Sequence, residues 1–356
     1  MKVAVLGCGA IGGLFLGYLT KQGHDVTGVV RDYQKELLLK EGLDIEGVRG
    51  SQKIKVKVDT KLTEKVDLAI FATKINDLEL IIKDNLEFLK DSTAISTQNG
   101  IRADYILKNF FAPEKIISSI VMFGATFYPP DKVIHNFEGE LVLGNVYETK
   151  VGQCDQVVNL LSPVFKVVNS ENIKGAKYLK LFVNLNNCIP AILGVSMQEA
   201  FADIDLARLA IKLNKEAYQL VNKADIKLAS LLSYPKERIE GLVKMPLDEA
   251  AGLFSKIMTN LSKQPLYGSI LQSIRRGKKS EIDYINGEII QLARDNNDQA
   301  PLNTKIVELV HKVEAGADFL SKQELLKGVA AACKTLNQSI ARQIALISIR
   351  LFPGLS

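Results

Sequence analysis

The chain has 356 residues, 47% hydrophobic and 24% charged, which is the composition of a globular protein long enough for two domains with substantial cores. Its net charge of +5 is small and its basic clusters have acids nearby, so the sequence indicates an anionic small ligand rather than nucleic acid. No apolar run is long enough to span a bilayer and a strand-like segment begins at once, so we expect no membrane segment, no signal peptide and a soluble cytoplasmic protein. The four cysteines lie far apart, without paired histidines, so we expect neither a disulfide framework nor a metal site.

A glycine-rich turn opens the chain. The apolar segment 3–6 runs into Gly7-Cys8-Gly9-Ala10-Ile11-Gly12, and an amphipathic, helix-like segment follows at 11–20. In a dinucleotide site the first glycine permits the tight turn, the second lets the backbone approach a pyrophosphate, and the third allows the helix to pack closely on the strand. A second strand-like segment, 25–30, follows at the required distance. We therefore predict a dinucleotide-binding turn here; the alternative is a glycine-rich turn that binds nothing.

The end of the second strand bears on the choice of nucleotide, because it runs into Arg31 and Asp32. NAD sites usually carry an acid at this place for the ribose 2′-hydroxyl, whereas NADP sites carry a basic group for the 2′-phosphate. Since a guanidinium is a planar, permanently charged donor, Arg31 favours NADP. Asp32 keeps NAD open as the less favoured cofactor, and the alternative for both residues is a pair of solvated loop charges.

The first half of the chain alternates strand-like and helix-like segments, which predicts an α/β domain with a Rossmann-type, mostly parallel sheet over residues 1–170. The expected strands are 3–6, 26–30, 68–72, 94–97 and 116–122, and the turn-rich stretch 127–146 predicts antiparallel ribbon at the edge of the sheet. From about residue 170 nearly every segment has helical periodicity, notably 179–193, 204–222, 249–261 and 281–295. We therefore predict an all-α domain over residues 171–356, with a fixed cleft between the two domains.

Three polar side chains recur along the segment 179–193. Lys180, Asn184 and Asn187 stand at i, i+4 and i+7, on one helix face, among large apolar neighbours. Because a buried lysine needs partners, this stripe fits the lining of a cavity; an amphipathic helix that turns a narrow polar face to solvent explains it equally well. Pro190 predicts that the helix is kinked or ends close by.

A second group of polar residues lies further along the chain. Ser269 and Ser273 share a helix face, and Gly277 precedes a helix whose first turn would contain Glu281 and Asp283. Acids are favoured in a first turn by the helix dipole, so Glu281 taken alone fits that structural role best.

Two loops follow expected strands. Thr73-Lys74 and Gln98-Asn99-Gly100 stand at the carboxyl ends of strands, where open α/β sheets bind ligands. Asn-Gly is also an ordinary turn signal, and Lys74 fits a solvated loop lysine as well. The three histidines show no partners in the sequence, so we do not expect catalysis by histidine.

Five motifs in this order give the chain a resemblance to the ketopantoate reductases (2-dehydropantoate 2-reductases). They are Gly7 to Gly12, Thr73-Lys74, Gln98-Asn99-Gly100, Lys180-Leu181-Phe182-Val183-Asn184, and Ser269 through Glu281-Ile282-Asp283-Tyr284-Ile285-Asn286-Gly287, of which the last is the most specific. The likeness covers residues 1–314 and includes Ala300-Pro301-Leu302-Asn303-Thr304. Such enzymes have an N-terminal Rossmann domain and an all-helical C-terminal domain, and they reduce a 2-oxo acid with NADPH.

The resemblance implies roles for individual residues. Lys180 would be the general acid that protonates the ketone oxygen as hydride arrives, Glu281 would bind and orient the substrate, and Ser269 would hold its carboxylate. Asn99 and Asn184 would position substrate and nicotinamide, with Asn187 as a further candidate for the substrate. At the cofactor the resemblance implies Arg31, Lys74, Asn99, Gly100 and the turn residues Gly7, Cys8, Gly9, Ala10, Ile11 and Gly12.

These roles agree with the chemistry of ketone reduction. Hydride addition develops an alkoxide, so a cationic donor aimed at that oxygen lowers the barrier and supplies the proton. A lysine suits this task because burial can move its pKa toward the working pH, which arginine does not allow. A carboxylate such as Glu281 opposite Lys180 would keep the ammonium from being stranded without a partner.

The sequence departs from the family pattern in three places. The stretch between Asn184 and Gly194 is one residue shorter than usual, which leaves open whether Asn187 or Cys188 takes the second asparagine position. Ser273 stands where some members carry an acid. Residues 315–356, with an amphipathic stretch at 336–351, extend beyond the usual end, and the sequence leaves open whether they dock on the cleft, dock on a second subunit or cap the helical domain.

The resemblance therefore implies an NADPH-dependent reductase that converts 2-dehydropantoate to (R)-pantoate for pantothenate and coenzyme A synthesis. One alternative is reduction of another branched 2-oxo acid, which Ser273 and the shortened stretch motivate. Another is a non-catalytic NADP-binding sensor or scaffold, which the C-terminal extension motivates. The oligomeric state is left open, with a homodimer as one candidate.

Overall fold

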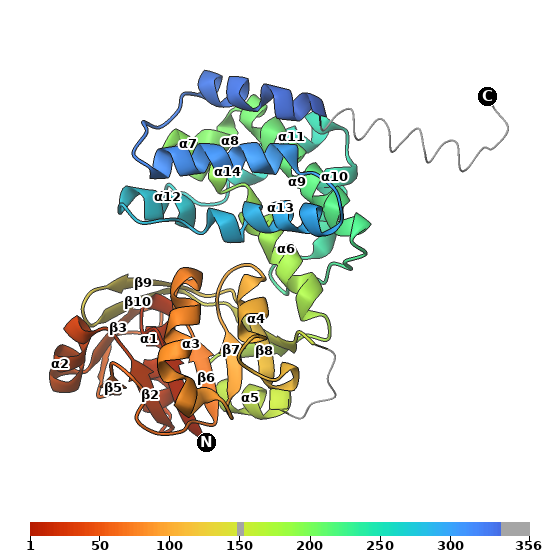
Figure 1. Ribbon diagram of the computed structural model, residues 1–356. Coiled ribbons are helices and arrows are strands. Elements are labelled where there is room, and N and C mark those ends of the chain that lie inside the picture. The colour runs from red at the N-terminus through yellow and green to blue at the C-terminus, as the bar shows by residue number, and fades with distance from the viewer. Residues whose placement is uncertain (148–152, 336–356) are drawn as a thin grey trace. The chain divides into compact units, whose positions relative to one another are not determined.

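The computed structural model describes residues 1–147 and 153–335 and divides the chain into two compact units (Figure 1). The first unit holds Met1–Lys177 together with Leu231–Ser233, and the second holds Tyr178–Ser230 and the chain from Tyr234 onward. The amphipathic stretch 336–351 lies outside the described residues. In the part that the structure describes, no helix has the length and apolarity needed to cross a membrane.

The first unit is built on an eight-stranded sheet in the order β12-β11-β8-β7-β6-β1-β2-β5. Its strands are β1 (Lys2–Leu6), β2 (Asp25–Val29), β5 (Lys57–Asp59), β6 (Leu68–Phe71), β7 (Thr93–Ser96), β8 (Ile116–Val121), β11 (Glu140–Asn145) and β12 (Lys166–Asn169). All neighbours are parallel except β11 against β8. The apolar runs of β1 and β6 are buried on both faces, as a sheet between helical layers requires. The predicted Rossmann-type fold is therefore confirmed.

The order of the strands reverses beside β1. The chain passes from β1 to β2 and β5 on one side, then returns to place β6, β7 and β8 on the other. Ligands bind open α/β sheets at the carboxyl ends of strands where such a reversal occurs. The helices that connect these strands are α1 (Ala10–Lys21), α2 (Asp32–Glu41), α3 (Ile75–Leu89), α4 (Arg102–Leu107) and α5 (Gln153–Leu161), with a 3-10 turn η1 at Pro113–Lys115.

A second, four-stranded sheet corrects the prediction for residues 127–146. Its order is β4-β3-β10-β9, with β3 at Leu43–Gly47, β4 at Gln52–Ile54, β9 at Gly124–Tyr128 and β10 at Lys132–Phe137. The antiparallel pair β9–β10 belongs to this sheet, and only β11 joins the main sheet. The reason is α1, which packs against strands of both sheets and is buried over residues 12–19. A helix that is apolar all round needs a cover on both sides.

The second unit is helical. Helix α6 (Ile173–Leu185) begins in the first unit and passes into the second at Tyr178. The second unit also contains α7 (Cys188–Leu193), α8 (Met197–Ala202), α9 (Ile204–Lys223), α10 (Lys236–Lys244), α11 (Leu247–Thr259), α12 (Ser269–Arg275), the 3-10 turn η2 (Ile282–Tyr284), α13 (Asn286–Asp295) and α14 (Pro301–Glu314). A further helical stretch covers residues 322–335. Helix α9 is the hub, because α8, α10, α11, α13 and α14 all contact it.

Two expected helices begin or end elsewhere than predicted. The segment 179–193 is two helices, α6 and α7, separated at Asn186 and Asn187. Pro190 explains the break, because a proline ring clashes with the carbonyl four residues earlier, here that of Asn186. The segment 281–295 starts as the 3-10 turn η2, and the α-helix begins only at Asn286. The expectation that Glu281 and Asp283 lie in the first turn of an α-helix is therefore wrong.

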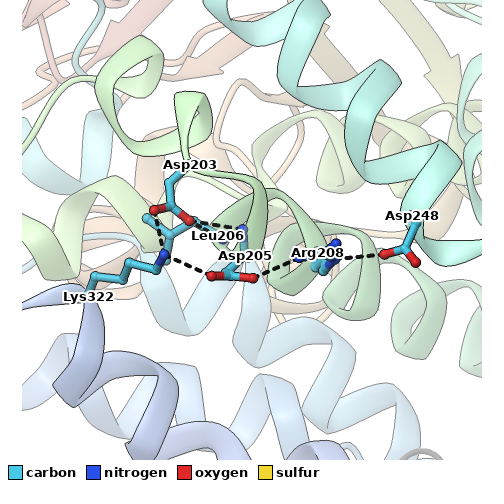
Figure 2. A network of polar contacts seen from close by, with 6 residues as sticks. All are labelled: Asp203, Asp205, Leu206, Arg208, Asp248 and Lys322. Atoms are coloured by element: carbon cyan, nitrogen blue, oxygen red, sulfur yellow. Dashed lines mark hydrogen bonds and ion pairs between the residues drawn. The ribbon is translucent and has the colours of Figure 1, made fainter.

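The described part of the C-terminal extension packs on the helical unit. Lys322 binds Asp203 and Asp205 through its Nζ at 2.6 and 2.8 Å (Figure 2). Asp203 also caps α9, and Arg208 joins Asp205 to Asp248 at the start of α11 (Figure 2). The extension also contributes core side chains, since Leu325 and Val329 are fully buried. Residues 315–335 are thus part of this unit.

Candidate active site

The turn between β1 and α1 has the geometry that the sequence predicts. Gly7 has a φ of +95°, and a Cβ at this position would lie 2.7 Å from the backbone nitrogen of Thr73. A Cβ on Gly12 would lie 2.2 Å from the carbonyl oxygen of Gly7, so only glycine lets α1 approach the strand. In contrast, a Cβ on Gly9 would meet nothing within 4 Å. The backbone at Gly9 therefore borders open space.

The amino end of α1 suits an anion. No side chain caps it, and its first turn carries no acid. Its first N–H groups are therefore not engaged by a capping side chain, and the helix dipole favours negative charge there. Together with the space beside Gly9, this end fits the pyrophosphate of a dinucleotide.

The thiol of Cys8 takes no part in this surface. It is 4% exposed, and its Sγ lies 3.5 Å from the carbonyl oxygen of Val5. Burial raises the pKa of the Cys8 thiol to about 12. Any contribution of Cys8 to a cofactor site would therefore come from its backbone.

Three loops meet at the carboxyl ends of β1, β6 and β7. Thr73 follows β6 and touches Gly7, while Gln98 follows β7 and donates from Nε2 to the carbonyl oxygens of Phe71 and Thr73, at 3.1 and 3.0 Å. These hydrogen bonds link the Thr73-Lys74 loop to the Asn99-Gly100 turn, and Gln98 itself is buried, at 7% exposed. Gly100 has a φ of +79°, which explains the glycine. The sequence showed these loops but not the linking role of Gln98.

Arg31 and Lys74 each stand directly before a helix in this unit. Arg31 precedes α2, Lys74 precedes α3, and both are exposed. Arg31 pairs with Asp77 in the first turn of α3, with 3.7 Å between Nη2 and Oδ2. Asp77 is a neighbour that the sequence analysis missed, because it stands 46 positions further along the chain from Arg31.

In the helical unit, Lys180 and Asn184 lie in α6, and Asn187 lies between α6 and α7. All three are partly exposed, whereas the neighbouring Leu179, Leu181 and Leu185 are fully buried. The polar stripe is therefore half-buried and lies between buried apolar side chains of the same helix.

Asn187 and Cys188 have different surroundings. A Cβ on Gly268 would lie 3.2 Å from the Cβ of Asn187, so Asn187 adjoins the amino end of α12, where Ser269 is the first residue. Cys188 is fully buried and donates from Sγ to the carbonyl oxygen of Leu185, 3.1 Å away. Burial also raises the pKa of its thiol to about 12. Of the two, Asn187 is the residue beside the exposed Ser269.

Glu281 sits at the entry to η2 and is half-buried. The turn around it is held from both sides: Glu314 accepts a hydrogen bond from the backbone of Ser280 at 2.7 Å, and His311 bridges Asp283 and Glu314 at 2.9 and 3.0 Å. Burial opposes the charge on His311, but the hydrogen bonds to Asp283 and Glu314 outweigh it and raise the His311 pKa. His311 is thus a structural residue with partners that the sequence did not reveal.

Among residues 1–147 and 153–335, no group of three or more His, Cys, Asp or Glu side chains is arranged to hold a metal ion.

Comparisons with known proteins cover both units. The family described as "Ketopantoate reductase PanE/ApbA" matches residues 3–148, and "Ketopantoate reductase PanE/ApbA C terminal" matches residues 172–314. The chain is 32% identical over 329 residues to 2-dehydropantoate 2-reductase of Pyrococcus horikoshii, with 88% of this chain and 98% of that protein covered. The enzyme of the same name from Pyrococcus abyssi is 30% identical over 318 residues, with the same coverage.

Solved structures share the fold. A ketopantoate reductase of Ralstonia eutropha superposes with a TM-score of 0.75 at 23% identity, covering 88% of this chain and 99% of that one. D-mandelate dehydrogenase, solved with NADH and anilino(oxo)acetate, superposes with a TM-score of 0.76 at 24% identity and the same coverage. The two family matches span both units of the described structure, and the chain therefore belongs to the ketopantoate reductase family of oxidoreductases.

Proposed function

We propose that this protein reduces 2-dehydropantoate to (R)-pantoate with NADPH, a step toward pantothenate and coenzyme A. The observation that carries the proposal is the similarity over 88% of the chain to relatives named 2-dehydropantoate 2-reductase. The chain carries, in the same order, the five motifs on which the resemblance rests. The half-buried Lys180 and Asn184 in one helix, with Asn187 beside the start of α12, add support from geometry.

The first unit would hold the cofactor. The backbone of residues 7–12 and the uncapped amino end of α1 would bind the pyrophosphate, and Arg31 would bind the 2′-phosphate that distinguishes NADP from NAD. Lys74, Asn99 and Gly100 would complete the site at the ends of β6 and β7. The reduced nicotinamide supplies the hydride when it is bound. Asp32, the first residue of α2, keeps NADH as the cofactor to be tested beside NADPH.

The second unit would supply the chemistry at the ketone. Lys180 would donate a proton to the oxygen as negative charge develops on it, which lowers the barrier and completes the alcohol. Glu281 would orient the substrate and balance the charge of Lys180. Ser269, exposed at the amino end of α12, would bind the substrate carboxylate together with the first N–H groups of that helix, while Asn184 and Asn187 would fix the substrate's position.

A different branched 2-oxo acid is the second candidate substrate. Ser273 is half-buried one turn after Ser269 on α12, at a position where some members of the family carry an acid. An exchange of charge near the substrate carboxylate alters which side chain of the substrate is tolerated.

The cytoplasm is the proposed location. All four cysteines, Cys8, Cys154, Cys188 and Cys333, are free thiols, as a reducing compartment allows.

A homodimer is the proposed alternative to the monomer, and light scattering on the purified protein distinguishes the two.

The decisive experiment measures steady-state oxidation of NADPH and NADH with 2-dehydropantoate and with a panel of branched 2-oxo acids. We expect 2-dehydropantoate with NADPH to give the highest kcat/KM. If kcat/KM for another acid is about tenfold or more above that for 2-dehydropantoate, which is equivalent to about 1.4 kcal/mol of transition-state binding, that acid is the substrate instead. Cofactor binding without turnover of any acid would instead support the sensor.

A further inference from the structure

A chain of buried polar side chains runs through the helical unit and ends beside the proposed catalytic residues. Its members, Glu216 on α9, Asn303 on α14 and Asn286 on α13, are at most 2% exposed. Buried polar groups are costly unless they are hydrogen-bonded, so a connected set of three marks a part of the fold whose geometry is closely specified.

Glu216 is the first member of this network, and it binds the amino end of α14. Its carboxylate accepts from the backbone N–H of Leu302 at 2.9 Å, from the backbone N–H of Asn303 at 2.8 Å and from Nδ2 of Asn303 at 2.7 Å. Burial raises the pKa of the Glu216 carboxyl, and these donors and the positive end of the helix dipole offset only part of that effect. The side chain of Asn303 is thereby fixed with its Oδ1 turned toward Asn286.

Asn286 connects Asn303 to the break between α6 and α7. Its Nδ2 donates to Oδ1 of Asn303 at 3.0 Å and to the carbonyl oxygen of Leu185 at 3.2 Å. In a continuous helix that carbonyl would accept from the N–H of Ile189, but here Ile189 donates to Asn186 instead. The carbonyl that loses its helical N–H donor at the break is therefore shared by the amide of Asn286 and the thiol of Cys188, whose Sγ lies 3.1 Å from it.

The two segments that Asn286 joins are the ones that carry the proposed catalytic groups. Leu185 follows Asn184 directly and stands five residues after Lys180, and Asn286 stands five residues after Glu281. We propose that Asn286 is a positioning residue, which sets the register of Lys180 and Asn184 relative to Glu281 without touching substrate. This inference rests on the proposed function, because it presumes that these residues act together on a 2-oxo acid.

The test compares Asn286→Asp and Asn286→Ala with a matched control, Asn214→Ala. Asn214 lies in α9 and is 1% exposed, but within the described residues neither of its side-chain polar atoms has a hydrogen-bond partner. We expect kcat to fall about 10- to 100-fold in both Asn286 variants, with KM for NADPH within about twofold, because misplacement of reacting groups costs rate rather than cofactor binding. Asn214→Ala should keep kcat within about twofold.

The pH profile separates positioning from a general loss of stability. The carboxyl introduced by Asn286→Asp donates to the Leu185 carbonyl only when it is protonated, so its kcat relative to that of Asn286→Ala should rise as the pH is lowered. A constant ratio across pH overturns the proposal. So does an unchanged kcat, an equal loss in Asn214→Ala, or loss of the folded state by circular dichroism in both Asn286 variants.

A readout without substrate keeps this inference separate from the proposed function. Amide hydrogen exchange at residues 184–189 should be faster in Asn286→Asp than in the wild type and in Asn214→Ala. If the wild type reduces no 2-oxo acid, the proposed function fails, whereas faster exchange would still show that Asn286 holds the break. Unchanged exchange at these residues overturns the positioning role whatever the activity.

Discussion

Arg31 and Asp77 form an ion pair in the first unit, with 3.7 Å between Nη2 and Oδ2. Both side chains are well exposed, at 71% and 54%, so solvent screens the pair and it contributes at most about 1 kcal/mol. A phosphate carries more charge than one carboxylate and can accept two parallel hydrogen bonds from a guanidinium. If NADP binds as proposed, its 2′-phosphate can therefore displace Asp77 from Arg31 at little cost.

Replacing Arg31 by alanine tests the choice of cofactor. Loss of a charge-assisted contact with phosphate costs about 1.5–3 kcal/mol, so the Kd for NADPH should rise about 10- to 100-fold. The Kd for NADH should hardly change, because NADH has no 2′-phosphate. Titration of nicotinamide fluorescence measures both constants.

The companion variant Asp77→Asn serves as the control for Arg31→Ala. It removes the competing carboxylate and keeps the shape of the side chain, so NADPH should bind up to about fivefold more tightly. Equal weakening of NADPH and NADH by Arg31→Ala would remove Arg31 from the phosphate site.

Gly9→Ala probes the space beside the turn. An added methyl meets no protein atom within 4 Å, so the variant should fold normally and keep its thermal midpoint. A pyrophosphate that approaches the backbone at Gly9 would collide with that methyl, and we expect the Kd for NADPH to rise at least about tenfold. Gly252→Ala is the control, since its methyl also meets nothing within 4 Å but lies in α11 of the other unit. Unchanged affinity in Gly9→Ala would place the cofactor elsewhere.

The fold class follows from local patterns in the sequence, and the parts that were missed lack such patterns. Strands β1, β6, β7 and β8 are short apolar runs, and such runs are typical of a parallel sheet buried on both faces. Strand β5 reads Lys-Val-Asp and β4 reads Gln-Lys-Ile, which are too short and polar to predict a strand. The second sheet depends on pairing β3 with β10, elements far apart in the chain, which no local pattern reveals.

The sequence indicates some features of the candidate site and leaves others open. The turn at residues 7–12 is recognisable because its glycines are required by the backbone itself. Sequence reasoning could not tell which of Asn187 and Cys188 is buried, since a shift of one residue turns a helical side chain by about 100°. The network from Glu216 to Asn286 joins four helices through side chains, and only the three-dimensional arrangement brings those side chains together.

Lys180→Ala tests the general acid. Removing a positioned proton donor lowers kcat by about 10²- to 10⁴-fold. The Kd for NADPH should stay close to that of the wild type, because the residues proposed to bind the cofactor belong to the first unit. The matched control is Lys174→Ala, an exposed lysine in the same helix. Equal background rates in wild type and Lys180→Ala would argue for a binding protein without turnover.

His311 makes the stability of the helical unit depend on pH. Its pKa is raised in the folded state, where it binds Asp283 and Glu314, so its contribution is fully present below the unfolded pKa of about 6.5 and is lost as the pH rises through the folded pKa. The side chain is 44% exposed, so screening keeps the effect below about 1 kcal/mol. We expect the difference in unfolding free energy between wild type and His311→Gln to be larger at about pH 5.5 than at about pH 8.5. An equal difference at both pH values would contradict the assignment.

Leu325→Ala tests whether the C-terminal extension is an integral part of the helical unit. Leu325 is fully buried, so its truncation should lower the free energy of unfolding by about 2–5 kcal/mol, through lost burial and the cavity left behind. Lys327→Ala, an exposed position two residues later, should change it by less than about 0.5 kcal/mol. Urea unfolding followed by circular dichroism measures both. If Leu325→Ala were as stable as Lys327→Ala, residues 322–335 would be an appendage that the folded unit does not need, and the ion pairs of Lys322 would be surface contacts of little consequence.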